Sequence, residues 1–349
     1  MRKSSVGTAV AAAFAAWVAT ATAPGANAQS VESFYKGKTI AVVIGYAPGG
    51  TYDATARLLT RHMGRHIPGE PAMVPQSMPG SGSVKAILHT YGVAPRDGTA
   101  LAMVARSYPI DPLFNPESEK YDPVKFNPIG STSTEVSTAV TWHTSPVKTL
   151  GDLLKPGVSI TAGATGTTDD TGRFPQLTKN LTGADIKIVL GYPGGNDVTL
   201  ALEKGEVDAR FGWSWGSVKS RSKQWLDEKK INIILQMALK KAPDLPDTPF
   251  IMDFAKTELD RQAMELIFAP QSFAWPLIAP PDVPADRLAA LRRAFAATMK
   301  DEKFIAEAEK LAIEVDPVSG EEMQATIKRI LAFPSTAVER AQVLTTAPR

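Results

Sequence analysis

Short apolar runs alternate with amphipathic stretches along the first part of this chain. Residues 39–44 (TIAVVI) are β-branched and bounded by turn residues, which predicts a buried strand. Residues 53–66 predict a helix with Asp53 at or near its N-cap. The runs at 72–76 and 101–105 predict two more strands, with a Gly/Ser turn and a helix between them. This β-α-β-α-β order predicts a parallel sheet.

The rest of the chain predicts a second unit of the same style. A Pro-, Asp- and Asn-rich stretch, 106–128, predicts a long loop. A helix is expected to begin in SPVKTLGDLL, and two late helices, one following Pro284 and one around Met323, are expected to cover the first sheet. Further strands are expected at 134–142, 158–163, 186–190, 207–211, 231–237 and 273–280.

The first 28 residues have the pattern of a secretory signal peptide. They begin with Arg2 and Lys3, continue through an Ala-rich apolar region and end in Ala-Asn-Ala. Cleavage after about Ala28 would leave 36 basic residues against 36 acidic ones, so we expect no nucleic-acid partner. The chain has no cysteine, which excludes disulfides and thiolate chemistry. We expect an exported protein in the periplasm of a Gram-negative cell.

One turn occurs twice: GYAPGG follows the first predicted strand, and GYPGG follows the strand at 186–190. Ligands of open parallel sheets bind at the loops that lead from strands into helices. Glycine allows close approach of backbone N–H groups, and a helix N-terminus attracts anions. Each turn alone is ordinary turn chemistry. The pair, with a third Gly/Thr turn at 163–168, indicates a cleft between two lobes that holds a small anion.

Two motifs suggest enzymes but lack the residues that an enzyme needs. GWSWG around Ser214 matches the nucleophile elbow of hydrolases, but no histidine follows it, so we expect Ser214 to be a cleft-wall or packing residue. His62 and His66 share a helix face without the Glu of a zinc protease, so we expect a solvated basic face there. Asp169 and Asp170 are expected to cap the next helix. Trp213 or Trp215 is expected to face the cleft.

Several long motifs, in this order, resemble the extracytoplasmic solute receptors of tripartite tricarboxylate transporters, the Bug-type binding proteins. The resemblance covers essentially the whole mature chain. The motifs are FYKGKTI, GYAPGGTYDATARLL, MPGSGS, APRDGTAL, TAGATGTT, GYPGGNDVTLALEKGEVDA, KKAPDLPDTP and APPDVPADRLAALRRAFAATMKD.

This resemblance implies an α/β fold of the type II periplasmic-binding-protein kind, with two lobes, each a mostly parallel sheet flanked by helices. It also implies two loops that hold a ligand carboxylate, Ala47–Asp53 and 163–168, with GYPGGND on the far side of the cleft. Arg106 stands where small residues are common in the family, and it is either a bidentate partner of the ligand or part of a surface salt bridge. The expected ligand-binding residues are Tyr46, Ala47, Pro48, Gly49, Gly50, Tyr52, Asp53, Ser81, Arg106, Ser107, Ala164, Thr165, Gly166, Thr167, Thr168, Tyr192, Gly194, Gly195, Asn196 and Trp213.

The sequence therefore predicts a monomeric receptor without cofactor, metal or catalytic residues. It would bind a small organic carboxylate and deliver it to the membrane permease subunits of a tripartite tricarboxylate transporter. We expect residues 29–131 and 256–349 to form one discontinuous lobe and 132–255 to form the other. The alternative is a secreted serine hydrolase that uses Ser214.

Overall fold

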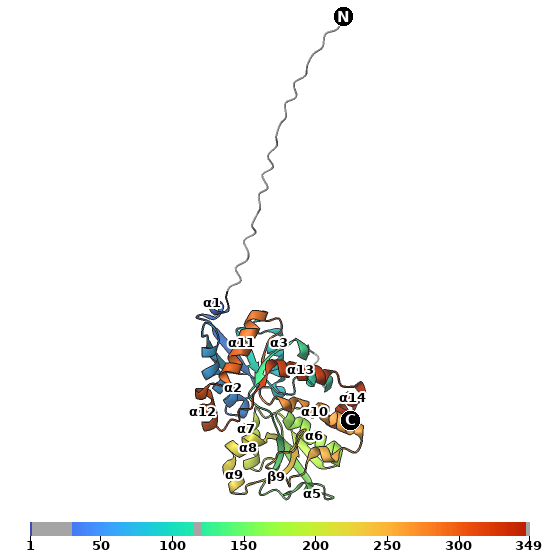
Figure 1. The fold of residues 1–349 in the computed structure, drawn as a ribbon. Coiled ribbons are helices and arrows are strands. Elements are labelled where there is room, and N and C mark those ends of the chain that lie inside the picture. The colour runs from blue at the N-terminus through green and yellow to red at the C-terminus, as the bar shows by residue number, and fades with distance from the viewer. Residues whose placement is uncertain (2–29, 115–119, 347–349) are drawn as a thin grey trace. The chain divides into compact units, whose positions relative to one another are not determined.

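The computed structural model describes residue 1, residues 30–114 and residues 120–346, in which all helices and strands lie in one compact unit that begins at Val31. The described residues form two separate sheets (Figure 1). The predicted signal peptide lies outside them, apart from Met1. No helix in the described part of the chain is long and apolar enough to cross a membrane.

The first sheet has six strands in the order β11-β4-β10-β3-β1-β2. β1, next to the edge strand β2, pairs in parallel with β2 and β3, as the β-α-β-α-β pattern predicts. β10 runs antiparallel to β3, and β4 and β11 extend the sheet with further antiparallel pairs. The strands are β1 (Thr39–Ile44), β2 (Ala72–Ser77), β3 (Ala100–Met103), β4 (Asn127–Ser131), β10 (Pro276–Ala279) and β11 (Val318–Ser319).

The second sheet has five strands in the order β7-β6-β8-β5-β9. β6 is parallel to β7 and β8, whereas β5 is antiparallel to both β8 and β9. The two sheets are therefore mixed. The strands are β5 (Ser137–Trp142), β6 (Ser159–Gly163), β7 (Asp185–Val189), β8 (Ala209–Ser214) and β9 (Ile231–Met237).

Helices connect the strands and cover the sheets. In the first lobe, which is built around the first sheet, α2 packs on β1 and β2, and α11 and α13 pack on β4. In the second lobe, built around the second sheet, α6 packs on β7 and β8, and α7 packs on β8. The helices of the first half are α1 (Val31–Tyr35), α2 (Thr51–His62), α3 (Val84–Gly92), α4 (Asp111–Phe114), α5 (Leu150–Leu153) and α6 (Asp170–Thr182). Those of the second half are α7 (Gly195–Glu203), α8 (Trp215–Arg221), α9 (Lys223–Asp227), α10 (Glu258–Phe268), α11 (Ala285–Thr298), α12 (Glu302–Lys310), α13 (Gly320–Leu331) and α14 (Ser335–Thr345). Short 3-10 turns are η1 (Met63–His66), η2 (Ser81–Ser83), η4 (Pro123–Lys125), η5 (Ile251–Phe254) and η6 (Ala269–Ser272).

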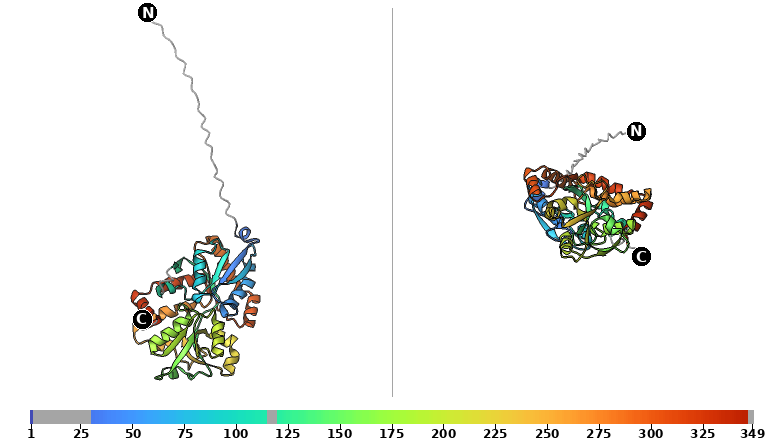
Figure 2. Two further views of the ribbon diagram at one scale, coloured as in Figure 1. Left: turned by 180° about the vertical axis from the view of Figure 1, so that it is seen from behind. Right: turned by 90° about the horizontal axis from the view of Figure 1, so that it is seen from below.

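The last helices connect the two lobes. α11 and α13 cover the first sheet as expected, but α14 packs against α10 and against α6 of the second lobe. Asn180 on α6 donates hydrogen bonds from Nδ2 to the carbonyl oxygens of Val343 at 3.0 Å and Thr346 at 2.9 Å. Figure 2 shows the C-terminal helices from behind and from below. The segment after residue 256 thus contacts both lobes, and the lobe boundaries stay a prediction.

Two expectations about local structure are wrong. The stretch 106–128 is not one long loop, because it contains α4, η4 and the start of β4. The helix at 53–66 does not present a solvated basic face. His62 is buried, and its Nε2 lies 2.5 Å from Oε2 of Glu307, while His66 Nε2 lies 2.7 Å from Asp301 Oδ2. These carboxylates belong to α12 and the residue before it, so the face binds another helix.

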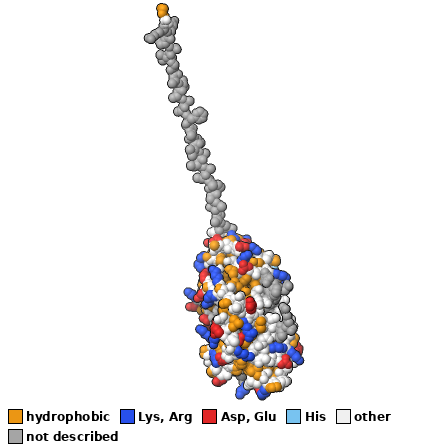
Figure 3. All heavy atoms as spheres, turned by 90° about the vertical axis from the view of Figure 1, so that its right-hand side faces the viewer, with side chains coloured by type: hydrophobic (Ala, Val, Ile, Leu, Met, Phe, Trp, Pro, Cys, Tyr) orange, Lys and Arg blue, Asp and Glu red, His pale blue; other side chains and the backbone are white. Residues whose placement is uncertain are grey.

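Charged side chains of both signs are interspersed on the molecular surface. Figure 3 shows one face, on which Lys and Arg side chains alternate with Asp and Glu and with scattered hydrophobic groups. That pattern is the balanced surface expected from the nearly equal numbers of basic and acidic residues.

Candidate ligand-binding cleft

A cavity of about 430 Å³ lies where the two lobes meet. Its walls come from the loops that follow β1, β3 and β6, and from the first turns of α2, α6 and α7. The end of β8, the short helices α8 and α9, and Trp275 before β10 complete it. Most of these segments follow the carboxyl ends of strands, where ligands of open α/β sheets bind. The cavity is within the size range of small-molecule sites.

The two related turns contact each other. Ala47 N in the first donates a hydrogen bond to Pro193 O in the second, at 3.3 Å. Close by, the hydroxyl groups of Thr51 and Ser217 lie 2.8 Å apart. The third predicted turn reaches the first lobe as well, because Thr168 Oγ1 donates to Ser81 O at 3.4 Å. The repeated turns therefore join the lobes at the edge of the cavity.

At two of the three predicted anion cradles, a carboxylate of the chain itself is bound. Gly49 N donates to Oδ2 of Asp53 at 2.9 Å, and Arg57 Nε donates to the other oxygen at 2.8 Å. Asp169 is the N-cap of α6, as expected, and accepts bonds from Thr171 N at 3.1 Å and Thr171 Oγ1 at 2.6 Å. These helix N-termini thus already have an anionic partner.

All the acceptor capacity of Asp169 is used. Besides its two bonds from Thr171, it accepts from Thr165 Oγ1 and, at 3.3 Å, from the Tyr46 hydroxyl of the first lobe. A carboxylate has about four acceptor sites, so these contacts saturate it. Burial raises the pKa of Asp169, while the bonds from Thr165 and Thr171 oppose that shift.

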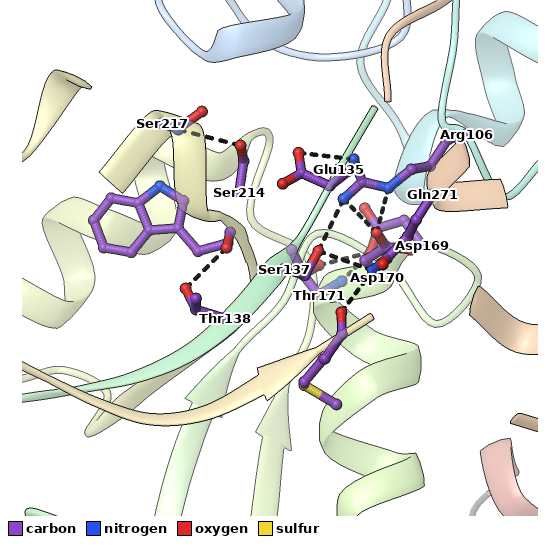
Figure 4. Close-up of polar contacts among 12 residues, drawn as sticks. Arg106, Glu135, Ser137, Thr138, Asp169, Asp170, Thr171, Ser214, Ser217 and Gln271 are labelled. Atoms are coloured by element: carbon purple, nitrogen blue, oxygen red, sulfur yellow. Dashed lines mark hydrogen bonds and ion pairs between the residues drawn. The ribbon is translucent and has the colours of Figure 1, made fainter. Parts of the chain in front are cut away.

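Arg106 lies at the centre of a buried ionic cluster (Figure 4). Its Nε donates to Asp170 Oδ2 at 2.6 Å, its Nη1 to Glu135 Oε2 at 3.2 Å, and its Nη2 to Ser137 Oγ at 3.2 Å. Burial raises the pKa of Glu135 to about 7, although the Arg106 charge opposes the shift. Arg106 lines the cavity, but two carboxylates of the chain already neutralise it. The salt bridge is buried and so differs from the surface pair considered above.

Arg210 is a buried cation of the cavity that forms no direct ion pair with the described residues. Its exposed fraction is 9%, and its Nε has no hydrogen-bond partner among the described residues. The charge of Asp169 acts on Arg210 and raises its pKa, but burial has the larger and opposite effect. Nη1 donates to Thr199 Oγ1, and the guanidinium carbon lies 4.4 Å from the centre of the Trp213 ring. Burial lowers the pKa of Arg210 to about 9. Burial of a charge that has no direct ion pair is costly, so this site favours an anion.

The N-terminus of α7 adds to the positive potential at Arg210. Gly195 and Asn196 are the first two residues of that helix, and both line the cavity. A methyl group at position 195 would lie 2.5 Å from Arg210 Nη2, so a larger residue there would displace the guanidinium from this position. A cation beside a helix N-terminus is unfavourable by itself, because both are positive. An anionic ligand at this place would satisfy both.

The remaining walls of the cavity are aromatic. In the first lobe the rings of Tyr46 and Tyr52 lie 4.4 Å apart, and Tyr52 meets Trp275 edge-on at 4.7 Å. In the second lobe the rings of Trp213 and Trp225 lie 6.3 Å apart, nearly perpendicular. All five rings line the cavity. Both lobes thus offer flat apolar surfaces to a ligand.

The structure brings about half of the expected ligand-binding residues to the cavity. Those that line it are Tyr46, Gly50, Tyr52, Arg106, Ser107, Thr165, Gly195, Asn196 and Trp213. Those that lie outside its lining are Ala47, Pro48, Gly49, Asp53, Ser81, Ala164, Gly166, Thr167, Thr168, Tyr192 and Gly194. Many of the latter are in the loops that join the lobes.

Other lining residues were not expected from the sequence. Asp170 was expected to cap a helix, and Trp225 was assigned no role. Arg210 was included only in the strand predicted at 207–211. The lone arginine between buried apolar positions of that strand, directly before the Trp-rich turn, is the signal that could have identified it. Thr51, within the expected loop Ala47–Asp53, and Ser214, expected at the cleft wall or in packing, also line the cavity. The unexpected lining residues are Ala105, Asp169, Asp170, Thr171, Thr199, Arg210, Gly212, Ser217, Arg221, Ser222, Gln224, Trp225 and Trp275.

Ser214 has a structural role at the start of α8. Its Oγ accepts a hydrogen bond from Ser217 N at 3.2 Å, which is an N-cap contact. The residues that line the cavity include no histidine. The predicted wall residue Trp215 instead donates from Nε1 to Asp244 at 2.9 Å, outside this cavity.

Comparison with known proteins agrees with this architecture. No protein-family model matches the chain. A curated relative, the UPF0065 protein in the tcbD-tcbE intergenic region of Pseudomonas sp. (strain P51), is 25% identical over 232 residues, which are 66% of this chain and 66% of the relative. The match thus spans just under two thirds of that protein.

Solved structures match over nearly their whole length. The periplasmic binding protein BugD superposes with a TM-score of 0.70 at 20% identity, covering 89% of this chain and 99% of BugD. MatC from Rhodopseudomonas palustris, solved with bound malate, gives a TM-score of 0.67 at 18% identity, covering 88% and 99%. The fold is therefore the two-lobed α/β fold of periplasmic binding proteins. Within that class it is the fold of the Bug-type solute-binding proteins, which the sequence motifs resemble.

Proposed function

We propose that this protein is a periplasmic solute receptor that holds a small organic carboxylate between its two lobes. The observation that carries this proposal is the buried guanidinium of Arg210, which lines the cavity between the lobes and whose Nε has no hydrogen-bond partner among the described residues. A carboxylate can accept two parallel hydrogen bonds from such a group. The Bug-type fold and the malate bound to MatC support the same ligand class.

Delivery to a membrane transporter completes the proposal. We infer that the leader is removed after about Ala28, that the mature receptor is a monomer, and that it passes its ligand to the permease subunits of a tripartite tricarboxylate-type transporter. The support is the likeness to Bug-type proteins and the signal-peptide pattern of the first 28 residues. Uptake of the ligand by cells that carry the transporter should then require this receptor.

Thermal unfolding of the mature protein tests ligand binding directly. A ligand that binds only the folded state, at one hundred times its Kd, stabilises that state by about 2.7 kcal/mol. For a chain of this length we expect the midpoint to rise by roughly 4 °C. The panel contains mono-, di- and tricarboxylates, aromatic acids and amino acids, with calorimetry on every hit. If no member of the panel shifts the midpoint or gives binding heat, the proposed function is wrong.

A further inference from the structure

Some charged groups of the cavity are already bound by other residues of the chain, whereas others can still bind a ligand. This difference restricts which charged groups the ligand can carry. Arg106 is neutralised by Asp170 and Glu135. Asp169 accepts four hydrogen bonds from the protein. An ammonium group of the ligand would therefore have to compete with the protein's own hydrogen bonds to Asp169 and with the Arg106 contacts to Oδ2 of Asp170. Arg210 differs from these groups because its buried Nε has no hydrogen-bond partner among the described residues.

A second ligand carboxylate has no comparable site. The other arginine of the lining, Arg221, is exposed, and an exposed guanidinium contributes little because water and salt screen it. Asp169 and Asp170, which also line the cavity, would repel a second negative charge. The cavity thus offers one strong anion position, at Arg210 and the N-terminus of α7.

The rest of the wall fits a flat apolar group. Tyr46, Tyr52 and Trp275 form a continuous aromatic cluster on the first lobe, and Trp213 and Trp225 face the cavity from the second. Aromatic rings stack favourably on other aromatic rings beyond the gain from buried area. Trp213 also lies under the Arg210 guanidinium, so one aromatic surface begins directly at the anion position.

We propose that the ligand is an aromatic monocarboxylate whose carboxylate pairs with Arg210 and whose ring lies between the aromatic walls of the two lobes. This inference rests on the proposed function and narrows it to one class of acid. Arg210 is then the anchor that selects for the single charge, and the aromatic side chains select for the ring.

Isothermal titration calorimetry on the full mature protein tests this class of ligand. The probes are benzoate and phenylacetate, the uncharged benzamide, the non-aromatic cyclohexanecarboxylate, the dicarboxylates malate and succinate, and phenylalanine. We expect an aromatic monocarboxylate to bind at least tenfold more tightly than any other probe. Tighter binding of a dicarboxylate, an amino acid or the cyclohexane acid would overturn this inference and leave the receptor function standing. Binding of no carboxylate at all would overturn both.

Substitution of Arg210 provides a second readout that a merely structural residue would not give. In Arg210→Gln we expect ten- to a hundredfold weaker binding of the aromatic acid, because a charge-assisted contact is lost. The same change removes an uncompensated buried charge, so the ligand-free protein should unfold at the same or a higher temperature. Arg293→Gln on the exposed face of α11 is the matched control and should change neither value. Unchanged affinity in Arg210→Gln would refute the anchor.

Substitution of an aromatic wall residue keeps the inference testable if Arg210→Gln does not fold. Trp225 is half-buried and belongs to the short helix α9, so its replacement disturbs little of the core. In Trp225→Leu the preference for benzoate over cyclohexanecarboxylate should fall at least threefold. An unchanged ratio would show that the wall of the second lobe does not contact the ring.

Discussion

Replacement of Arg106 by methionine distinguishes a role in folding from a role in ligand contact. The guanidinium joins the loop after β3 to Asp170 at the start of α6 and to Glu135 before β5. The side chains of these three residues are 5%, 13% and 3% exposed. Methionine fills a similar volume but leaves both carboxylates buried without a cation. Removal of one partner from a buried ion pair costs about 3–5 kcal/mol.

The contacts that Arg106 makes determine how much stability the Arg106→Met variant loses. Two contacts to Asp170, at 2.6 Å and 2.5 Å, and one to Glu135 at 3.2 Å disappear together. Glu135 can take up a proton, so most of the penalty falls on Asp170. We therefore expect the free energy of unfolding in urea at pH 8 to fall by about 3 kcal/mol.

Replacing the two carboxylates that contact Arg106 by neutral amides should restore the stability lost in Arg106→Met. In the triple variant Arg106→Met, Glu135→Gln, Asp170→Asn no charge is left unpaired, and most of the 3 kcal/mol should return. Arg293→Met serves as the exposed control. A loss below about 1 kcal/mol in Arg106→Met, accompanied by a large loss of ligand affinity, would refute the buried-cluster reasoning and restore Arg106 as a ligand partner.

Three further predictions follow from burial, close contact and capping. The pKa of Glu135 is about 7 in the folded protein against an ordinary 4.5, so the proton that Glu135 retains stabilises the fold below pH 4.5. Relative to Glu135→Gln this contribution is up to about 3 kcal/mol, and it disappears as the pH rises through 7. Parallel pH–stability curves for the two proteins would contradict this prediction. A methyl group at Gly166 would lie 2.6 Å from the Gly82 N of the first lobe, so Gly166→Ala should weaken ligand binding at least tenfold by calorimetry, with near-normal circular dichroism. Ser214→Ala should lower stability by about 1 kcal/mol through loss of the α8 cap and leave affinity within threefold, whereas loss of a measured esterase activity in this variant would support a hydrolase.

The sequence predicted the elements whose side chains repeat with a regular period. The runs at 39–44 and 231–237 are β1 and β9, residue for residue in both cases. β4 was missed because Asn127–Ser131 contains Pro and Gly, which indicate a loop when the chain is taken alone. It becomes a strand because β10, which is distant in sequence, pairs with it on one side.

For the candidate site, too, the sequence predicted local motifs but not contacts between distant residues. The glycine-rich turns that flank the cavity could be located from local spacing, since each turn is a contiguous motif. The ionic state of Arg106 could not, because its partner Asp170 lies 64 residues away in sequence. The position of Arg210 in its strand could have marked it as a candidate, but its unbonded Nε can be recognised only in the folded chain.

The contact between the last helix and α6 has a consequence for the order in which the protein folds. Residues 170–182 are made early, but their outer side is covered by residues 335–345, through the carbonyl oxygens that Asn180 binds. Phe174 on α6 also packs on Phe268 of α10, at 5.0 Å between ring centres. A growing chain therefore cannot bury this side of its second lobe until synthesis is nearly complete. Such long-range contacts slow folding. In the proposed exported receptor they would keep the growing chain unfolded, which is the state that can pass through an export channel.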